Sequence, residues 1–151
     1  MGGVAPTSPA SRAAGLAARV TLQSFDWRTL HLAQKLMPGV PTVYLTTASP
    51  NLDNARNPQW TAGLKLDDFG GSVPRMVKAA GGAAWSPSLT GLTAQAVQEA
   101  HALGLKVIPW TVNSANDMQR LMDWGVDGLI TDYPDRLRDQ MRLRGLPLPR
   151  P

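Results

Sequence analysis

The chain has 151 residues, of which 43% are hydrophobic and 17% charged, and it contains no cysteine. These values are typical of one globular domain or a piece of one, and they exclude disulfide bonds and thiolate metal sites. The net charge of +4 suits an anionic small molecule but is too small to indicate nucleic acid. No apolar run reaches roughly 18 residues, so no integral membrane segment is expected. The first residues also lack a signal-peptide pattern, and the cellular location stays unknown.

The first strand and helix of the chain follow a segment, residues 1–15, that is rich in proline, serine and small residues. This composition predicts a disordered N-terminal segment, with the folded part spanning residues 16–148. Val20 to Phe25 is typical of a strand, and Asp26 can cap a helix that begins after it. The spacing of apolar residues predicts that this helix buries one face, made of Leu30, Ala33, Leu36 and Met37.

A second predicted strand, Pro41 to Thr46, leads into a long stretch without periodicity, Ser49 to Gly71. A loop of this length in a compact domain is usually functional or an insertion. Its two large aromatic residues, Trp60 and Phe69, either anchor a lid or pin the loop onto the body of the domain. We favour pinning, because aromatic side chains in loops most often serve packing.

Strands and helices continue to alternate to the end of the chain. Three further strands are predicted, and the connections are long enough for parallel crossovers. An α/β protein with five parallel strands follows, although Pro109 conflicts with a central strand because proline donates no ladder hydrogen bond. The predicted elements are a helix over Val73–Ala80, a strand over Gly82–Trp85, a helix after Thr93, a strand over Lys106–Val112, a helix after Ser114, a strand over Gly128–Thr131 and a helix over Tyr133–Leu143.

Four motifs carry a family resemblance. They are Gln23–Asp26 (QSFD), Pro109–Asn113 (PWTVN), Gly125–Gly128 (GVDG) and Ile130–Pro134 (ITDYP). In this order and spacing they resemble the C-terminal part of glycerophosphodiester phosphodiesterases. The resemblance implies a partial (βα)₈ TIM barrel that contains about the last five βα units. It also implies an enzyme that hydrolyses small-molecule glycerophosphodiesters to an alcohol and glycerol 3-phosphate with a divalent metal, Ca or Mg.

The catalytic motifs of that family have no counterpart in this chain. Relatives carry His-Arg-Gly, Glu-x-Asp, a second histidine and Glu-x-Lys, whereas the chain has a single glutamate, Glu99, and two histidines, His31 and His101. Both histidines fall within predicted helices, where packing or surface roles are usual. Asp67–Asp68 is expected to be a solvated pair. No catalytic residue and no metal ligand is therefore predicted, and the chain alone is expected to be an inactive fragment.

The resemblance does implicate Phe25 and Trp110 in substrate binding. Both stand near the ends of predicted strands, and active sites of TIM barrels lie at the C-terminal ends of the strands. They would form an apolar wall against the glycerol or the leaving alcohol, and the competing interpretation is that both are core aromatics. Asn113 and Asp132 also follow strand ends, where Asp132 is more simply a turn former than an acid.

Two alternatives to a phosphodiesterase fragment stay open. One is a non-catalytic half-barrel module for binding or assembly, and the other is a different phosphate-handling TIM-barrel phosphodiesterase. Under any of these interpretations, an incomplete barrel leaves strand edges and interior side chains open to solvent, which predicts self-association. The arginines after residue 135 are expected to form a solvated helix face.

Overall fold

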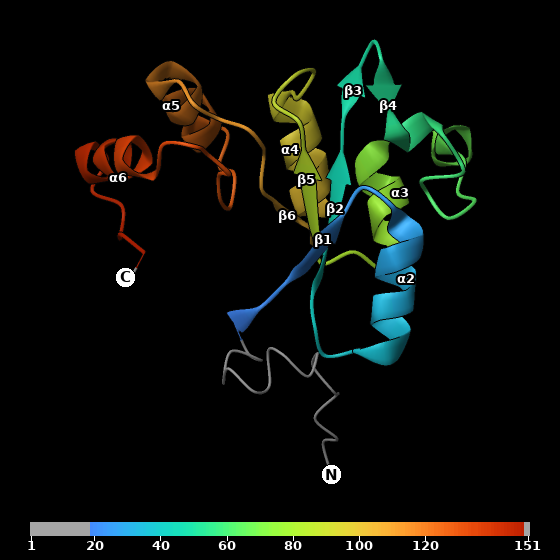
Figure 1. Ribbon diagram of the computed structural model, residues 1–151. Coiled ribbons are helices and arrows are strands. Elements are labelled where there is room, and N and C mark those ends of the chain that lie inside the picture. Colours follow the sequence, from blue (N-terminus) through green and yellow to red (C-terminus); the bar gives the residue numbers. More distant parts are fainter. Residues whose placement is uncertain (1–18, 150–151) are drawn as a thin grey trace.

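Four parallel strands form one sheet in the order β1-β2-β5-β6 in the computed structural model, which describes residues 19–149 (Figure 1). The parallel βα alternation predicted from the sequence is confirmed. The predicted disorder of residues 1–15 lies outside the described residues. The strands are β1 (Leu22–Ser24), β2 (Thr42–Thr46), β5 (Ala84–Pro87) and β6 (Lys106–Val107).

Three helices cover one face of this sheet: α2 (Trp27–Leu36), α3 (Val73–Ala79) and α4 (Ala94–Ala102). Each begins at a side-chain cap, because a hydroxyl or carboxylate accepts an otherwise unpaired helical N–H. The caps Asp26 and Thr93 were predicted from the sequence, whereas Ser72, the cap of α3, was not. Asp26 accepts from the backbone N–H of Arg28 at 3.1 Å. The fully buried residues that join the helices to the sheet include Trp27, Leu30, Tyr44, Met76, Val77, Val97, Ala100 and Val107.

The predicted burial of Leu36 is wrong, because its side chain is 60% exposed. Trp27, Leu30 and Ala33 are buried, and each step of three residues along a helix turns the contact face back by about 60°. After three such steps Leu36 has turned away from the sheet, whereas Met37 is half-buried.

The other face of the sheet carries no helix among the described residues. Side chains alternate between faces along each strand, and the register aligns Gln23, Val43, Ala84 and Lys106 across the uncovered face. We call this surface, with Leu45 and Ile108 further along the strands, the inner face. Gln23 and Lys106 are exposed there, and Leu45 and Ile108 are half-buried.

The stretch from Ser49 to Gly71 has more order than the sequence predicts. It contains a short antiparallel hairpin formed by β3 (Ala48–Ser49) and β4 (Leu52–Asp53), followed by the 3₁₀ helices η2 (Asn54–Arg56) and η3 (Leu66–Phe69). Phe69 packs against the main core, whereas Trp60 is 37% exposed. The segment therefore folds over the C-terminal ends of β1 and β2.

The strand predicted over Lys106–Val112 is regular only at β6, and the regular strand predicted over Gly128–Thr131 is wrong. Asp127 N donates to Val107 O at 2.9 Å, and a parallel ladder would continue with residue 109 donating to Asp127 O. Residue 109 is proline and has no N–H, so that bond cannot form. The pairing resumes only when Ile130 N donates to Pro109 O at 2.9 Å.

Two further helices, α5 (Ala115–Asp123) and α6 (Pro134–Leu143), lie together beyond β6 (Figure 1). The helix predicted after Ser114 is confirmed. Asp117 N donates to Ser114 Oγ at 3.0 Å, and that hydroxyl donates to the Asp117 carboxylate at 2.7 Å. A second small core of Val112, Met118 and Leu121 holds α5. No residue of α6 is buried. Within residues 19–149, every helix is too short or too polar to cross a bilayer.

We expect Gly82→Ala to lower the free energy of unfolding by about 1–3 kcal/mol, since small-to-large changes in a packed site force neighbours to move. A Cβ at this position would lie 2.7 Å from Val77 Cγ1 and 2.9 Å from Tyr44 Cδ2. Urea titration followed by circular dichroism measures the change. Ala83→Ser at the exposed neighbouring position is the control. A Gly82→Ala variant as stable as this control would show that Val77 and Tyr44 can move aside at no cost in stability.

Candidate functional site

The two aromatic residues expected to line a substrate pocket meet at the C-terminal ends of the strands. Phe25 directly follows β1, and Trp110 lies three residues beyond β6. Their rings make an edge-to-face contact with centroids 5.4 Å apart and an interplanar angle of 85°. Three strand spacings of about 4.8 Å separate the outer strands of a flat sheet by about 14 Å. The contact therefore requires the sheet to curl around the inner face, as the wall of a barrel does.

Trp110 is held by hydrogen bonds from both its backbone and its indole ring. Its backbone N donates to Pro87 O at 3.0 Å, and its carbonyl accepts from Leu89 N at 2.7 Å. Its Nε1–H donates to Ser86 O at 2.9 Å. These bonds fix the indole ring against β5. The ring is half-buried, so its accessible part presents a fixed surface at the inner face.

The backbone carbonyl of Phe25 is bonded to Asn54, a residue that the sequence did not single out. Asn54 is 1% exposed, and its Nδ2 donates to Phe25 O at 3.2 Å and to Leu45 O at 3.0 Å. Its Oδ1 accepts from Thr47 N at 2.9 Å. The only sequence signal is an asparagine in a loop that also contains Asn51 and Asn57, and nothing in that pattern marks the buried one.

Asn113 and Asp132, the polar residues that follow the last two predicted strands, bind each other. Asn113 Nδ2 donates to Asp132 Oδ2 at 2.9 Å, and Asn113 Oδ1 accepts from Asp132 N at 3.0 Å and from Thr131 Oγ1 at 3.2 Å. Arg136 also donates to the Asn113 carbonyl. The pair ties the chain after Trp110 to the turn that precedes α6, which agrees with a turn-forming role for Asp132.

The two histidines lie away from the aromatic pair. His31 is in α2, which lies on the helix side of the sheet. His101 is in α4, where its Nε2 is 2.8 Å from Asp127 Oδ2, and the same oxygen accepts from Val107 N at 2.8 Å. Asp127 thus links His101 to the start of the strand after α4, at the opposite end of the sheet from Trp110. Neither histidine can reach a group bound against Phe25 and Trp110.

The residues described by the structure do not fit the divalent metal that the resemblance implies. Residues 19–149 contain no cluster of three His, Asp or Glu side chains. Of the carboxylates near the C-terminal strand ends, Asp26 pairs with Arg28 at 2.6 Å and Asp53 with Arg56 at 3.4 Å. The third, Asp132, accepts from Asn113. The bonded Arg28 guanidinium lowers the pKa of Asp26. Asp67 and Asp68 lie in η3 and are exposed, as expected for a solvated pair.

The arginines of α6 do not form an open anion-binding face. Arg142 pairs with Asp139 at 2.5 Å, and Arg144 pairs with Asp123 at 2.7 Å. Arg138 donates to the Pro149 carbonyl at 3.1 Å. Arg136 lies over the Tyr133 ring, 4.4 Å from its centroid. Each charge is solvated but has a partner, so the face offers little to a phosphate.

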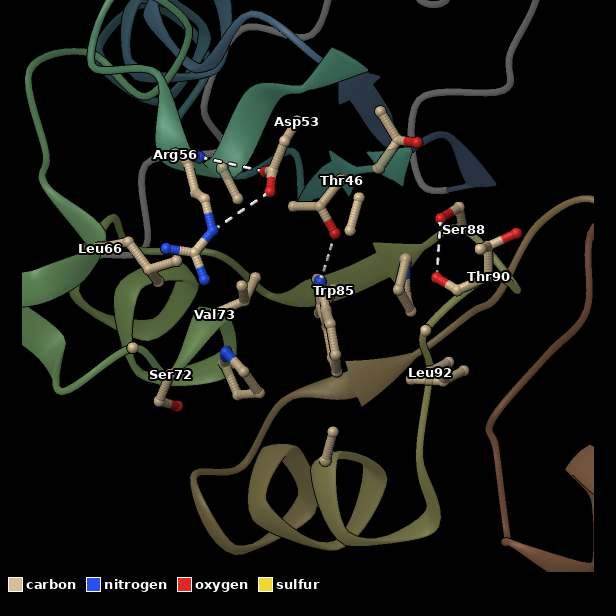
Figure 2. Close-up of a pocket in the computed structure, with 18 of the residues that line it drawn as sticks. Thr46, Asp53, Arg56, Leu66, Ser72, Val73, Trp85, Ser88, Thr90 and Leu92 are labelled. Carbon is tan, nitrogen blue, oxygen red and sulfur yellow. Dashed lines mark hydrogen bonds and ion pairs between the residues drawn. The ribbon is translucent and has the colours of Figure 1, made fainter. Parts of the chain in front are cut away.

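A separate cavity of about 250 Å³ lies on the helix side of the sheet, at the ends of β2 and β5 (Figure 2). Leu66, Val73, Trp85 and Leu92 provide apolar walls, and the Arg56–Asp53 pair lies at its rim. Trp85 Nε1 donates to Thr46 Oγ1 at 2.8 Å. The register places Trp85 on the opposite face of the sheet from the Phe25–Trp110 contact, so this cavity is not the expected substrate pocket.

Comparison with known proteins points to one class of enzyme. The model of the glycerophosphoryl diester phosphodiesterase family matches residues 7–136. A Bacillus subtilis glycerophosphodiester phosphodiesterase is 32% identical over 78% of this chain and 34% of its own length. A second, from Bacillus altitudinis, is 32% identical over 82% of this chain and 44% of its own.

The solved structures agree in fold. A Silicibacter pomeroyi protein described as a glycerophosphoryl diester phosphodiesterase has a TM-score of 0.76 at 35% identity, over 92% of this chain and 43% of that one. An Oleispira antarctica phosphodiesterase, in complex with the product sn-glycerol-3-phosphate, has a TM-score of 0.62 at 19% identity, over 88% of this chain and 47% of that one. The chain thus spans less than half the length of these relatives.

Proposed function

Given that this chain belongs to the glycerophosphoryl diester phosphodiesterase family, we propose that it forms the substrate-contacting wall of a TIM-barrel hydrolase. The complete enzyme would cleave a small-molecule glycerophosphodiester to an alcohol and glycerol 3-phosphate. One observation carries the proposal for this chain. The edge-to-face contact of Phe25 and Trp110, 5.4 Å between centroids, lies at the end of the sheet where barrel enzymes bind substrates.

In this proposal, Phe25 and Trp110 bind and orient the substrate but do not transfer protons. Their half-buried rings cover the carbon side of a glycerol or alcohol group and keep water from it. The acid, the base and the divalent metal, Ca or Mg, would be held by residues outside this chain. The Oleispira antarctica structure, which holds sn-glycerol-3-phosphate in a similar fold, supports this product class.

Release of glycerol 3-phosphate, followed with a coupled dehydrogenase, tests the proposal. The chain is co-expressed with the N-terminal part of a relative that carries His-Arg-Gly, Glu-x-Asp and Glu-x-Lys, and glycerophosphocholine and glycerophosphoethanolamine are offered as substrates. A co-purified pair that releases glycerol 3-phosphate from either substrate supports the proposed function. A stably assembled pair without any release would contradict it.

A non-catalytic assembly module is the second candidate, and the uncovered inner face is the observation that favours it. Leu45 and Ile108 are half-buried there without a covering helix among the described residues. Open strand edges and apolar faces promote association between protein chains. We therefore include self-association of the chain in the proposal, under either candidate.

The isolated chain is expected to sediment as species larger than its 16.2 kDa monomer. Leu45→Lys places a charge on the inner face and should shift the population toward monomer. Leu143→Lys is the matched control, because Leu143 is 77% exposed on α6 and lies outside the inner face. Analytical ultracentrifugation at several concentrations measures the effect. A monomeric chain that unfolds cooperatively would count against association through the inner face.

A further inference from the structure

We propose that Asn54 is a positioning residue for substrate binding, because it holds Phe25 in contact with Trp110. The inference rests on the proposed function only where it concerns substrate, and its structural part stands without it. Asn54 belongs to η2, in the long segment between β2 and α3, and is not part of the aromatic wall itself. Its side chain nevertheless joins three backbone groups around that wall.

The bonding pattern of Asn54 can be supplied only by a side-chain amide. One Nδ2 donates to the carbonyls of Phe25 and Leu45, at 3.2 Å and 3.0 Å, while Oδ1 accepts from Thr47 N at 2.9 Å. A buried polar group destabilises the fold when its hydrogen-bond partners are lost. Asparagine satisfies two acceptors and one donor at once, whereas aspartate would set a carboxylate against two carbonyl oxygens.

These bonds fix the part of the wall that has fewest other supports. Trp110 is bonded to β5 through its backbone and its ring. Phe25, in contrast, lies just after the last residue of β1, where the ladder to β2 has ended at Ser24 and Tyr44. The carbonyl bond from Asn54 links Phe25 to the end of β2, where Leu45 and Thr47 stand. Asp26 N donates to Ser24 Oγ at 3.0 Å beside it, but among residues 19–149 the Asn54 bond is the one that holds the Phe25 carbonyl itself.

The fold also explains why the support comes from this segment. The β3–β4 hairpin turns the chain back over the end of β2, and Asp53 begins η2 by accepting from Arg56 N at 3.2 Å. This turn brings Asn54 to the strand ends, where it bonds to the carbonyls of Phe25 and Leu45. Its neighbours Asp53 and Arg56 line the separate cavity on the helix side of the sheet (Figure 2). Neighbouring residues of this segment thus point to different sides. Asp53 and Arg56 form an ion pair at the cavity on the helix side, and Asn54 supports the Phe25 end of the aromatic wall.

Fluorine NMR of the full chain, with its five tryptophans replaced by 5-fluorotryptophan, tests the positioning role directly. The Trp110 signal is assigned by its loss in Trp110→Phe, and Phe25→Leu establishes how far it moves when the edge-to-face contact is lost. Asn54→Asp is expected to shift that signal in the same direction. Asn57→Asp is the matched control, because the bond that the Asn57 side chain accepts within residues 19–149 is the local one from Gln59 N at 3.0 Å.

An unmoved Trp110 signal in Asn54→Asp, with a clear shift in Phe25→Leu, would overturn the proposal. Should Asn54→Asp fail to fold, Asn54→Ser, which keeps one hydroxyl donor, replaces it under the same two outcomes. In the active pair, Asn54→Asp should raise KM about fivefold or more with a smaller change in kcat, as expected for lost substrate binding. Equal KM values would refute the substrate part. Absence of turnover in every pair would contradict the proposed function, and the NMR result would still decide the positioning role.

Discussion

The purified chain alone is expected to release no glycerol 3-phosphate above the buffer control, with Ca, Mg or any other divalent metal. Cleavage of a phosphodiester needs a base, an acid for the leaving alkoxide and positive charge on the non-bridging oxygens. The chain has two histidines, and His101 is bonded to Asp127 at the far end of the sheet. Arginines that bound substrate and transition state equally would add no rate.

Pairing with an N-terminal part that carries the family motifs should change this result by many orders of magnitude. Enzymes typically accelerate reactions by about 10⁶-fold or more, so restoration is unmistakable in a coupled assay. The control is the same N-terminal part with its first histidine replaced by alanine, which should assemble without activity. Metal-dependent turnover by the chain alone would mean that a set of acid, base and metal ligands exists within its own 151 residues.

In the active pair, Trp110→Ala is expected to lower kcat/KM about 10-fold to 100-fold, which corresponds to roughly 1.4–2.7 kcal/mol of lost transition-state binding. The indole covers the end of the inner face and contacts Phe25, so its removal opens the apolar wall to water. The same change removes the bond to Ser86 O and an aromatic contact worth about 0.5–1.5 kcal/mol. Some loss of stability therefore accompanies the loss of activity.

Trp85→Phe separates these two effects. Trp85 is 5% exposed and lies on the helix side of the same sheet, so its replacement should reduce stability and leave KM for the diester unchanged. Activity is expressed per folded molecule, with the folded fraction taken from urea titration. If Trp110→Ala lost stability like Trp85→Phe and kept full activity per folded molecule, Trp110 would be a core residue and the pocket assignment would be wrong.

Local chemistry was sufficient to predict most elements of this fold. Asp26, Ser114 and Thr93 cap helices where their side chains can accept a nearby N–H, and this depends on residues only two or three positions away. Apolar spacing likewise predicted the buried positions Leu30 and Ala33. The parallel orientation of the strands could be expected from the length of their connections alone. These signals lie within one turn of helix or one strand, so they are readable without tertiary structure.

Other outcomes depended on residues that are distant in the chain. Pro109 interrupts the pairing with residues 127–131, because it has no N–H to donate to the Asp127 carbonyl. Only the tertiary register shows that this carbonyl is the one that loses its donor. Leu36 lies at helical spacing from Leu30 and Ala33, but successive steps of three residues turn its side chain away from the sheet.

The candidate site divides in the same way. The motifs around Phe25 and Trp110 indicated both aromatic residues, but their 5.4 Å contact depends on the curl of the sheet. Asn54 could not be distinguished from its loop neighbours, because its three bonding partners are backbone groups up to 29 residues away. Backbone partners leave no side-chain pattern in the sequence, and only folding brings the amide to them.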